Sequence, residues 1–169
     1  MGLSEFPVRV LVADDFKHWL SFLSAVLAKQ PELELIGQAS DGVEAVQQAQ
    51  QLRPDLILLD IGLPTLNGIE AARQIRENHA CKILFLSENR AADIVEEALS
   101  TGAGGYVVKS DANRELLPAI KAVLSGETFV STSLSMHVEV GSGNRPSVSH
   151  RIENNPYLLL RAANRFPSS

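Results

Sequence analysis

Short apolar runs alternate with amphipathic segments along the first 125 residues of the chain. The first run, residues 8–13, is rich in β-branched residues and stops at two aspartates, which is typical of a strand buried on both faces of a sheet. Apolar residues then recur at three- and four-residue spacing over residues 16–29, which predicts a helix that ends before Pro31. Trp19 and Phe22 belong to the apolar stripe of this helix and are expected in the core.

The same alternation occurs four more times before residue 126. The expected strand and helix pairs cover residues 33–39 and 43–51, 56–60 and 69–78, 82–87 and 91–100, and 105–108 and 113–125. Buried strands joined through helices form parallel sheets, because right-handed crossovers lay the helices over the faces. The pattern therefore predicts an α/β fold, a doubly wound (βα)5 sandwich with a five-stranded parallel sheet.

The length of 169 residues fits this one domain and leaves a remainder. We expect an N-terminal leader over residues 1–7, the α/β domain over 8–128 and a C-terminal tail over 129–169. Alternating residues at 134–140 and 148–152 predict a hairpin in the tail. Asn155 and Pro156 then supply an N-cap and a first-turn proline, which predicts a short helix.

Charge and cysteine content narrow the function classes. Of the formal net charge of −5, residues 1–130 carry −7 and the remainder +2. Nucleic-acid binding usually needs a clustered basic face, so we expect no direct DNA binding. No apolar stretch approaches the ~20 residues of a membrane-spanning helix. The single cysteine, Cys81, has no internal disulfide partner and is expected to pack in the core. From the lack of a disulfide and of a membrane-spanning stretch, we expect a cytoplasmic protein that does not bind membranes.

Chemically active side chains stand where the predicted strands end. In a doubly wound sheet ligands bind beyond the carboxyl ends of the strands, near the point where strand order reverses. The residues at those ends are Asp14, Asp15, Asp60, Ser87 and Lys109. Each one has an ordinary structural explanation, but together they predict a pocket.

Three converging carboxylates repel one another unless a cation lies between them. Oxygen donors without histidine or cysteine favour Mg²⁺, and Mn²⁺ can replace it. The Ser87 hydroxyl and the Lys109 ammonium suit the oxygens of a phosphoryl group. Asp60 ends the central apolar run and is rigidly placed, so we expect it to be the nucleophile, while the adjacent Asp14 and Asp15 share the metal.

These residues resemble the receiver domain of two-component response regulators, the CheY-like family with a flavodoxin-like fold. The resemblance covers about residues 8–125. It rests on the five pocket residues in order and on two further elements, which are the Leu-Asp-Ile-Gly-Leu-Pro-Thr-Leu-Asn-Gly run around Asp60 and the Gly-Tyr-Val-Val-Lys run that ends at Lys109. The residues around Asp60 and the Lys109-Ser110-Asp111 ending are most similar to the NarL/FixJ subfamily, which usually carries a LuxR-type helix-turn-helix output domain. Residues 131–169 are too short for that output.

The resemblance implies phosphotransfer from a sensor histidine kinase or phosphotransfer protein to Asp60. Mg²⁺ would be held by Asp15, Asp60 and the backbone carbonyl of Gly62, with Asp14 contributing directly or through water. Lys109 would pair with the phosphoryl group and with Asp60. Transfer and slow autodephosphorylation would be self-catalysed, so the chain would be a phosphoacceptor and not an enzyme that turns over.

The resemblance also implies a switch. Ser87 would shift to bind a phosphoryl oxygen and Tyr106 would turn inward, which changes the face formed by the fourth helix, fifth strand and fifth helix. A downstream protein or a second copy of the chain would bind that face. Serine replaces the threonine often found at position 87, and Ser110 stands where many receivers have proline.

Gly62 and Asn89 lie two residues after Asp60 and Ser87, and we expect them to set the lifetime of the aspartyl phosphate. The alternative for Gly62 is that it only permits the loop conformation. Two other functions stay open: a Mg²⁺-dependent phosphohydrolase with an aspartyl nucleophile, and a docking module that is never phosphorylated. Such hydrolases usually have a second acid where this chain has Gly62, and the intact set of five residues argues against the docking module.

Overall fold

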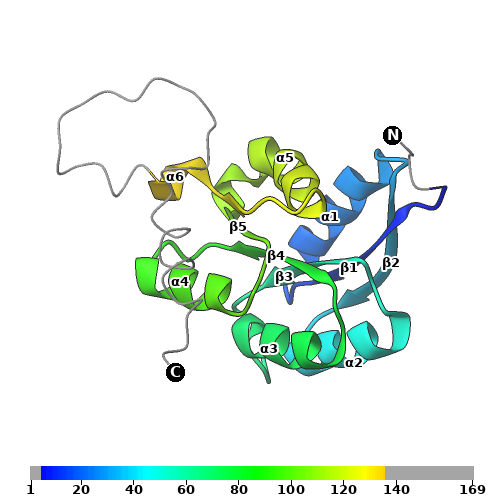
Figure 1. The fold of residues 1–169 in the computed structure, drawn as a ribbon, viewed down its shortest axis with the longest axis horizontal. Helices are drawn as coiled ribbons and strands as arrows, with labels where there is room; N and C mark the ends of the chain where they lie inside the picture. Colours follow the sequence, from blue (N-terminus) through cyan, green and yellow to red (C-terminus); the bar gives the residue numbers. More distant parts are fainter. Residues whose placement is uncertain (1–4, 136–169) are drawn as a thin grey trace, which may run out of the picture.

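A computed structural model describes residues 5–135 as an α/β sandwich around one parallel sheet (Figure 1). The six strands lie in the order β2-β1-β3-β4-β5-β6, and every neighbouring pair is parallel. The strands are β1 Val8–Ala13, β2 Leu33–Ala39, β3 Leu56–Asp60, β4 Lys82–Ser87, β5 Gly105–Val108 and β6 Phe129–Val130. The predicted fold class is confirmed, and the sheet has one strand more than the sequence predicted.

Helices cover both faces of the sheet (Figure 1). They are α1 Lys17–Ala28, α2 Gly42–Leu52, α3 Gly68–Asn78, α4 Ala92–Ser100, α5 Ala112–Leu124 and α6 Thr132–Ser135, with a 3₁₀ turn, η1, at Lys109–Asp111. Side chains of α1 and α5 form one buried cluster with the sheet, and side chains of α2, α3 and α4 form the other. None of the helices within residues 5–135 has the length and apolarity to cross a bilayer.

Two helices begin at caps that their sequences encode. The Asp41 side chain accepts a hydrogen bond from the Glu44 N–H at 2.8 Å, and the Glu44 carboxylate accepts one from the Ser40 N–H at 2.9 Å. At α3, the Asn67 side chain accepts from the Glu70 N–H at 3.0 Å. These caps satisfy N–H groups that have no partner inside the helix, and they fix where the loops after β2 and β3 end.

The topology brings the ends of β1 and β3 together. The chain passes from β1 to β2 on one side and then returns to β3 on the other, so strand order reverses between these neighbours. The crevice at such a point lies beyond the carboxyl ends of both strands. Asp14 and Asp15 follow β1 and Asp60 ends β3, so the carboxylates predicted to converge leave the sheet side by side.

The start of the predicted tail packs on the sheet. Residues 129–130 pair with β5 as β6, which the sequence did not predict because a two-residue strand carries no alternation. Leu134, expected to begin a strand, lies buried in α6 and packs against the core, so that part of the prediction was wrong. The remainder of the predicted hairpin, the short helix after Asn155 and residues 1–4 of the leader lie outside the described residues.

Candidate functional site

Three carboxylates meet at the carboxyl edge of the sheet. Ligand oxygens of Asp14, Asp15 and Asp60 all lie within 4.8 Å of one another. Asp14 and Asp60 are buried, whereas Asp15 is exposed. The sequence prediction that these residues form one cluster is confirmed. Such a cluster suits a hard divalent cation, because the cation offsets the mutual repulsion of the carboxylates.

Lys109 reaches the same point from the end of β5. Its Nζ lies 2.6 Å from Asp14 Oδ2 and 3.5 Å from Asp60 Oδ2, and the side chain is buried. Asp14 Oδ1 accepts a hydrogen bond from the Phe16 N–H at 2.8 Å. Both oxygens of Asp14 are therefore engaged by the protein, while Asp60 makes the longer and weaker of the two ion pairs.

Burial raises the pKa of Asp60 above the ordinary value of 3.8. The positive charge of Lys109 opposes this rise, the negative charge of Asp14 adds to it, and a hydrogen bond from the Gly62 backbone opposes it. Loss of hydration is the largest of these causes. The site therefore disfavours the ionised carboxylate in the absence of added positive charge, which is the condition that a bound cation would relieve.

Two carboxylates of the cluster, Asp15 and Asp60, line an open cleft of roughly 320 Å³ together with Lys109. The cleft is lined by Asp15, Phe16, Trp19, Asp60, Ile61, Gly62, Ser87, Glu88, Asn89 and Lys109. Six of the residues predicted for the site are among them, including the two positions assigned to phosphoryl lifetime. The Asp60 side chain thus faces a space that is open to solvent.

Ser87 and Tyr106 are joined through the loop after β4. The Asn89 N–H donates to Ser87 Oγ at 3.1 Å, and the Tyr106 hydroxyl donates to the Asn89 carbonyl at 2.8 Å. Tyr106 is fully buried, so the structure has its side chain in the inward position that the resemblance assigns to the switched state. One loop residue, Asn89, therefore contacts both residues of the predicted switch.

Gly62 does not need to be a glycine for its backbone conformation. Its φ angle lies outside the left-handed region, where only Arg53, Thr65, Gly102 and Gly126 are found among residues 5–135. A Cβ built at Gly62 would have Asp60 Oδ2 as its only neighbour within 4 Å, at 3.8 Å. This removes the conformational explanation for Gly62 and leaves open space beside the carboxylate of Asp60.

Gly68, by contrast, is required by close packing. A Cβ at Gly68 would lie 2.0 Å from the backbone oxygen of Asp60, and the Gly68 N–H donates to the Ile61 carbonyl at 2.8 Å. The Asn-Gly pair of the loop thus places the start of α3 directly against the end of β3. The position of the Asp60 backbone therefore depends on the absence of a side chain at Gly68.

Gly68→Ala is expected to lower the free energy of unfolding by about 2 kcal/mol or more, because backbone atoms must shift to admit the methyl group. Urea denaturation measures the change. Gly62→Ala is the matched control and should leave stability nearly unchanged. Equal stability of the two variants would contradict the packing described at Gly68.

The structure places Trp19 at the edge of the core predicted for it. Its side chain packs against the core, but it is only partly buried and also lines the cleft, which the sequence did not predict. Lys109 Nζ lies over the ring, 5.0 Å from its centroid. The position of Trp19 could have indicated this, because it stands in the first turn of the helix that follows the Asp14-Asp15 pair.

Cys81 is buried, as predicted from the sequence, and burial raises the pKa of its thiol to about 11.

Comparison with known proteins identifies the family in which this arrangement of residues occurs. The sequence pattern of the response regulator receiver domain matches residues 10–121, more than half of the chain. The chain belongs to the response regulator receiver family. This confirms the family predicted from the pocket residues and the loops that flank them.

The relatives include regulators of the predicted subfamily. The transcriptional regulatory protein LiaR of Bacillus subtilis is 40% identical over 76% of this chain, and the nitrate/nitrite response regulator protein NarL of Escherichia coli K12 is 32% identical over 76%. The chain spans 61% and 60% of these proteins. A solved LuxR-family response regulator from Aurantimonas has a TM-score of 0.74 at 29% identity, covering 78% of this chain and 95% of that one. The receiver domain of Thermotoga maritima CheB has a TM-score of 0.66 at 33% identity, covering 70% of this chain and 97% of that one.

Proposed function

We propose that this receiver accepts a phosphoryl group on Asp60 from a phosphohistidine of a sensor kinase or phosphotransfer protein and then changes a protein-interaction face. The observation that carries the proposal is the placement of Asp60. Its carboxylate opens into the cleft, with Asp14 and Asp15 oxygens within 4.8 Å and the Lys109 ammonium at 3.5 Å. Location in the cytoplasm, where such a donor is found, is part of the proposal.

The donor set fits Mg²⁺, and Mn²⁺ by the same chemistry. Asp15, Asp60 and the Gly62 carbonyl would hold the ion, and Asp14, whose two oxygens already bind Lys109 and the Phe16 N–H, would act through a water or a remaining lone pair. The bound cation supplies charge neutralisation to the carboxylates and to the incoming phosphoryl oxygens. The raised pKa of Asp60 supports this fit, because added positive charge favours the ionised, nucleophilic form.

In the transfer step an ionised Asp60 oxygen attacks the phosphorus of the donor. A new O–P bond forms, the P–N bond to the donor imidazole breaks, and the imidazole leaves with its electron pair and takes a proton from solvent. Lys109 neutralises charge on the transferring group, and the Ser87 hydroxyl donates to one phosphoryl oxygen. Positioning and charge neutralisation thus account for catalysis, as is usual for phosphoryl transfer.

The loop after β4 supports a route from this site to the chain that follows α5. The Arg90 guanidinium donates to Ser110 Oγ at 2.8 Å and to Ser133 Oγ at 3.2 Å. Arg90 therefore joins the loop that follows Ser87 to Ser110, the residue after Lys109, and to Ser133 of α6. If Ser87 turns to a phosphoryl oxygen, the Asn89 N–H loses its acceptor, and the adjacent Arg90 contacts are the next to change.

Residues 131–133 attach the chain after β6 to α5 and β5 by consecutive hydrogen bonds. Ser131 Oγ accepts from the Val108 N–H at 2.8 Å, and Thr132 Oγ1 donates to Glu115 Oε1 at 2.5 Å. Ser133 Oγ donates to Asp111 Oδ2 at 2.5 Å. Residues 129–135 thus form part of the α4, β5 and α5 face in this protein, and a downstream protein or second copy would meet them there.

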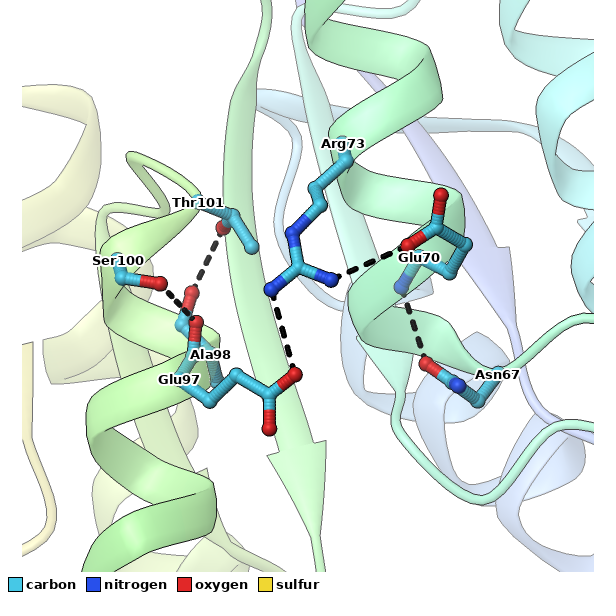
Figure 2. Close-up of polar contacts among 7 residues, drawn as sticks. All are labelled: Asn67, Glu70, Arg73, Glu97, Ala98, Ser100 and Thr101. Atoms are coloured by element: carbon cyan, nitrogen blue, oxygen red, sulfur yellow. Dashed lines mark hydrogen bonds and ion pairs between the residues drawn. The ribbon is translucent and has the colours of Figure 1, made fainter.

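An ion pair also joins α4 to α3 (Figure 2). Arg73 lies 3.1 Å from Glu70 Oε2 on its own helix and 3.2 Å from Glu97 Oε1 on α4. Surface pairs of this kind contribute about 0–1 kcal/mol, and these side chains are substantially exposed. The polar contacts of Arg90 before α4 and of Glu97 within it are weak, so they would allow α4 to shift when the site changes.

Arg90→Ala is expected to speed amide hydrogen exchange at residues 131–134 in the unphosphorylated protein, because their tether to the β4–α4 loop is lost. Incubation with Mg²⁺ and acetyl phosphate should speed exchange of the same amides in the wild type and add little in the variant. Arg114→Ala, which removes an exposed partner of Asp111, is the control. No effect of phosphorylation on these amides in the wild type would remove this route from the proposal.

Gly62→Met is expected to lengthen the lifetime of the phosphorylated protein several-fold, because a long side chain can fill the open space beside Asp60 and exclude the attacking water. Loss of the phosphoryl group after removal of the donor, followed by intact mass, measures it. Asn89→Met tests the second predicted position in the same assay. An unchanged lifetime in both variants would contradict the assignment of these residues.

Incubation with Mg²⁺ and acetyl phosphate, followed by intact mass, tests the function itself. The proposal predicts one phosphoryl adduct on the wild type and none on Asp60→Ala. Sustained hydrolysis of small phosphate esters would instead support the phosphohydrolase. Absence of an adduct from both acetyl phosphate and a phosphorylated histidine kinase would support the docking module.

A further inference from the structure

We infer that Trp19 is a positioning residue for Lys109, holding its ammonium over the indole face in the phosphoacceptor cleft. The inference rests on the proposed function, since Lys109 acts there on the transferring group. The contact that joins the Trp19 ring to the site is the one with the Lys109 ammonium, so we expect its effect on the reaction to run through Lys109.

The contacts of Lys109 Nζ show what the ring supplies. Asp14 and Asp60 pair with the ammonium at 2.6 and 3.5 Å, and the Trp19 ring lies 5.0 Å away at its centroid. A cation within about 6 Å of an aromatic face is attracted by the ring quadrupole, and most strongly by tryptophan. The indole therefore replaces water on one side of the ammonium without adding a negative charge to a cluster that already holds three carboxylates.

The ring is itself held in place. Phe22, one turn further along α1, packs edge to face against Trp19, with ring centroids 5.2 Å apart and an interplanar angle of 88°. Both rings pack against the cluster that α1 and α5 form with the sheet. An aromatic pair at this spacing is a stable helix-surface contact, so the indole has a fixed orientation from which to hold a flexible lysine.

The backbone turn that orients Asp14 also orients Trp19. The Phe16 N–H donates to Asp14 Oδ1 at 2.8 Å, and the Trp19 N–H donates to the Phe16 carbonyl at 2.9 Å. Asp14 and Trp19, which both contact Lys109 Nζ, are thus fixed by one turn at the start of α1. Lysine has a flexible four-carbon stem, and restraint from two sides defines where its charge meets a phosphoryl group.

Two substitutions distinguish the effect of the aromatic face of Trp19 from the effect of its apolar bulk. Trp19→Phe keeps an aromatic face and Trp19→Leu keeps only apolar bulk. With Mg²⁺ and acetyl phosphate, we expect Trp19→Leu to form the adduct about tenfold more slowly than the wild type and Trp19→Phe to fall between them. Phe6→Leu, at an exposed aromatic residue outside the cleft, is the control.

The decisive comparison repeats both substitutions with Lys109→Met. A residue that acts only through Lys109 has no further effect once the ammonium is gone, so Trp19→Leu should leave the slower rate of Lys109→Met unchanged. An equal fractional loss in both backgrounds, or a Trp19→Leu rate equal to wild type, would overturn the inference.

Fluorescence distinguishes failure of this inference from failure of the proposed function. Trp19 is the single tryptophan of the chain, so its emission reports on the indole alone. We expect Lys109→Met to shift that emission and Lys109→Arg, which keeps a cation, to shift it less. A wild type that takes no adduct would defeat the proposed function, whereas emission unchanged by Lys109→Met would defeat the contact between Trp19 and Lys109.

Discussion

Asp60→Asn is expected to raise the free energy of unfolding at neutral pH when no divalent cation is present. The substitution keeps the shape of the side chain and removes a charge that burial and Asp14 disfavour. Lys109 keeps its shorter ion pair with Asp14, so the loss of its contact with Asp60 does not leave the ammonium unpaired. With Mg²⁺ the order should reverse, because the wild type gains stability from binding and the variant loses a ligand.

The pH dependence follows from the direction of the Asp60 pKa. A carboxyl group with a raised pKa in the folded state stabilises the fold while it is protonated, and this contribution is lost as pH rises from 3.8 through the folded-state pKa. The stability of the wild type relative to Asp60→Asn should therefore fall across that interval and then stay level.

Urea denaturation with and without Mg²⁺ measures both effects. Asp93→Asn, which removes an exposed carboxylate in the first turn of α4, is the control for the loss of one negative charge. A wild type whose stability does not respond to Mg²⁺, or an Asp60→Asn variant that responds equally, would contradict the metal site.

Lys109→Met is expected to lower the free energy of unfolding by about 3 kcal/mol without divalent cation, because it leaves buried carboxylates without their ammonium partner. Methionine retains the length and apolar character of the stem, so cavity formation contributes little. Mg²⁺ should restore part of the loss, since it supplies positive charge to the same carboxylates.

A double-mutant cycle with Asp60→Asn tests the electrostatic cause. Removing the Asp60 charge should reduce the cost of Lys109→Met, so the double variant is expected to be more stable than the sum of the single changes predicts. Strictly additive effects would show that Lys109 stabilises the fold independently of Asp60.

The strands and helices that a regular hydrophobic pattern marks could be predicted from the sequence alone. Residues 56–59, for example, are all apolar and are followed by Asp60, so the end of the strand and the side chain at the edge of the sheet can be predicted together. The rule that ligands bind beyond the strand ends then brought Asp14, Asp15, Asp60 and Lys109 to one place, and the distances among them agree.

Other features depend on tertiary contacts that periodicity does not encode. Trp19 belongs to the apolar stripe of α1. Its position in the cleft beside Lys109, which follows β5, depends on how α1 packs on the sheet. β6 is two residues long and exists because the free edge of β5 accepts it. Leu134 fits an alternating pattern, but hydrogen bonds of Thr132 and Ser133 with α5 and η1 hold the segment as a helical turn.

Identifying the modified residue tests most directly whether Asp60 carries the phosphoryl group. The protein is incubated with Mg²⁺ and acetyl phosphate and treated with borohydride, which reduces an aspartyl phosphate to homoserine, and the modified peptide is sequenced by mass spectrometry. We predict homoserine at position 60 and aspartate retained at positions 14 and 15. Homoserine at position 14 or 15, or at none of the three, would contradict the account.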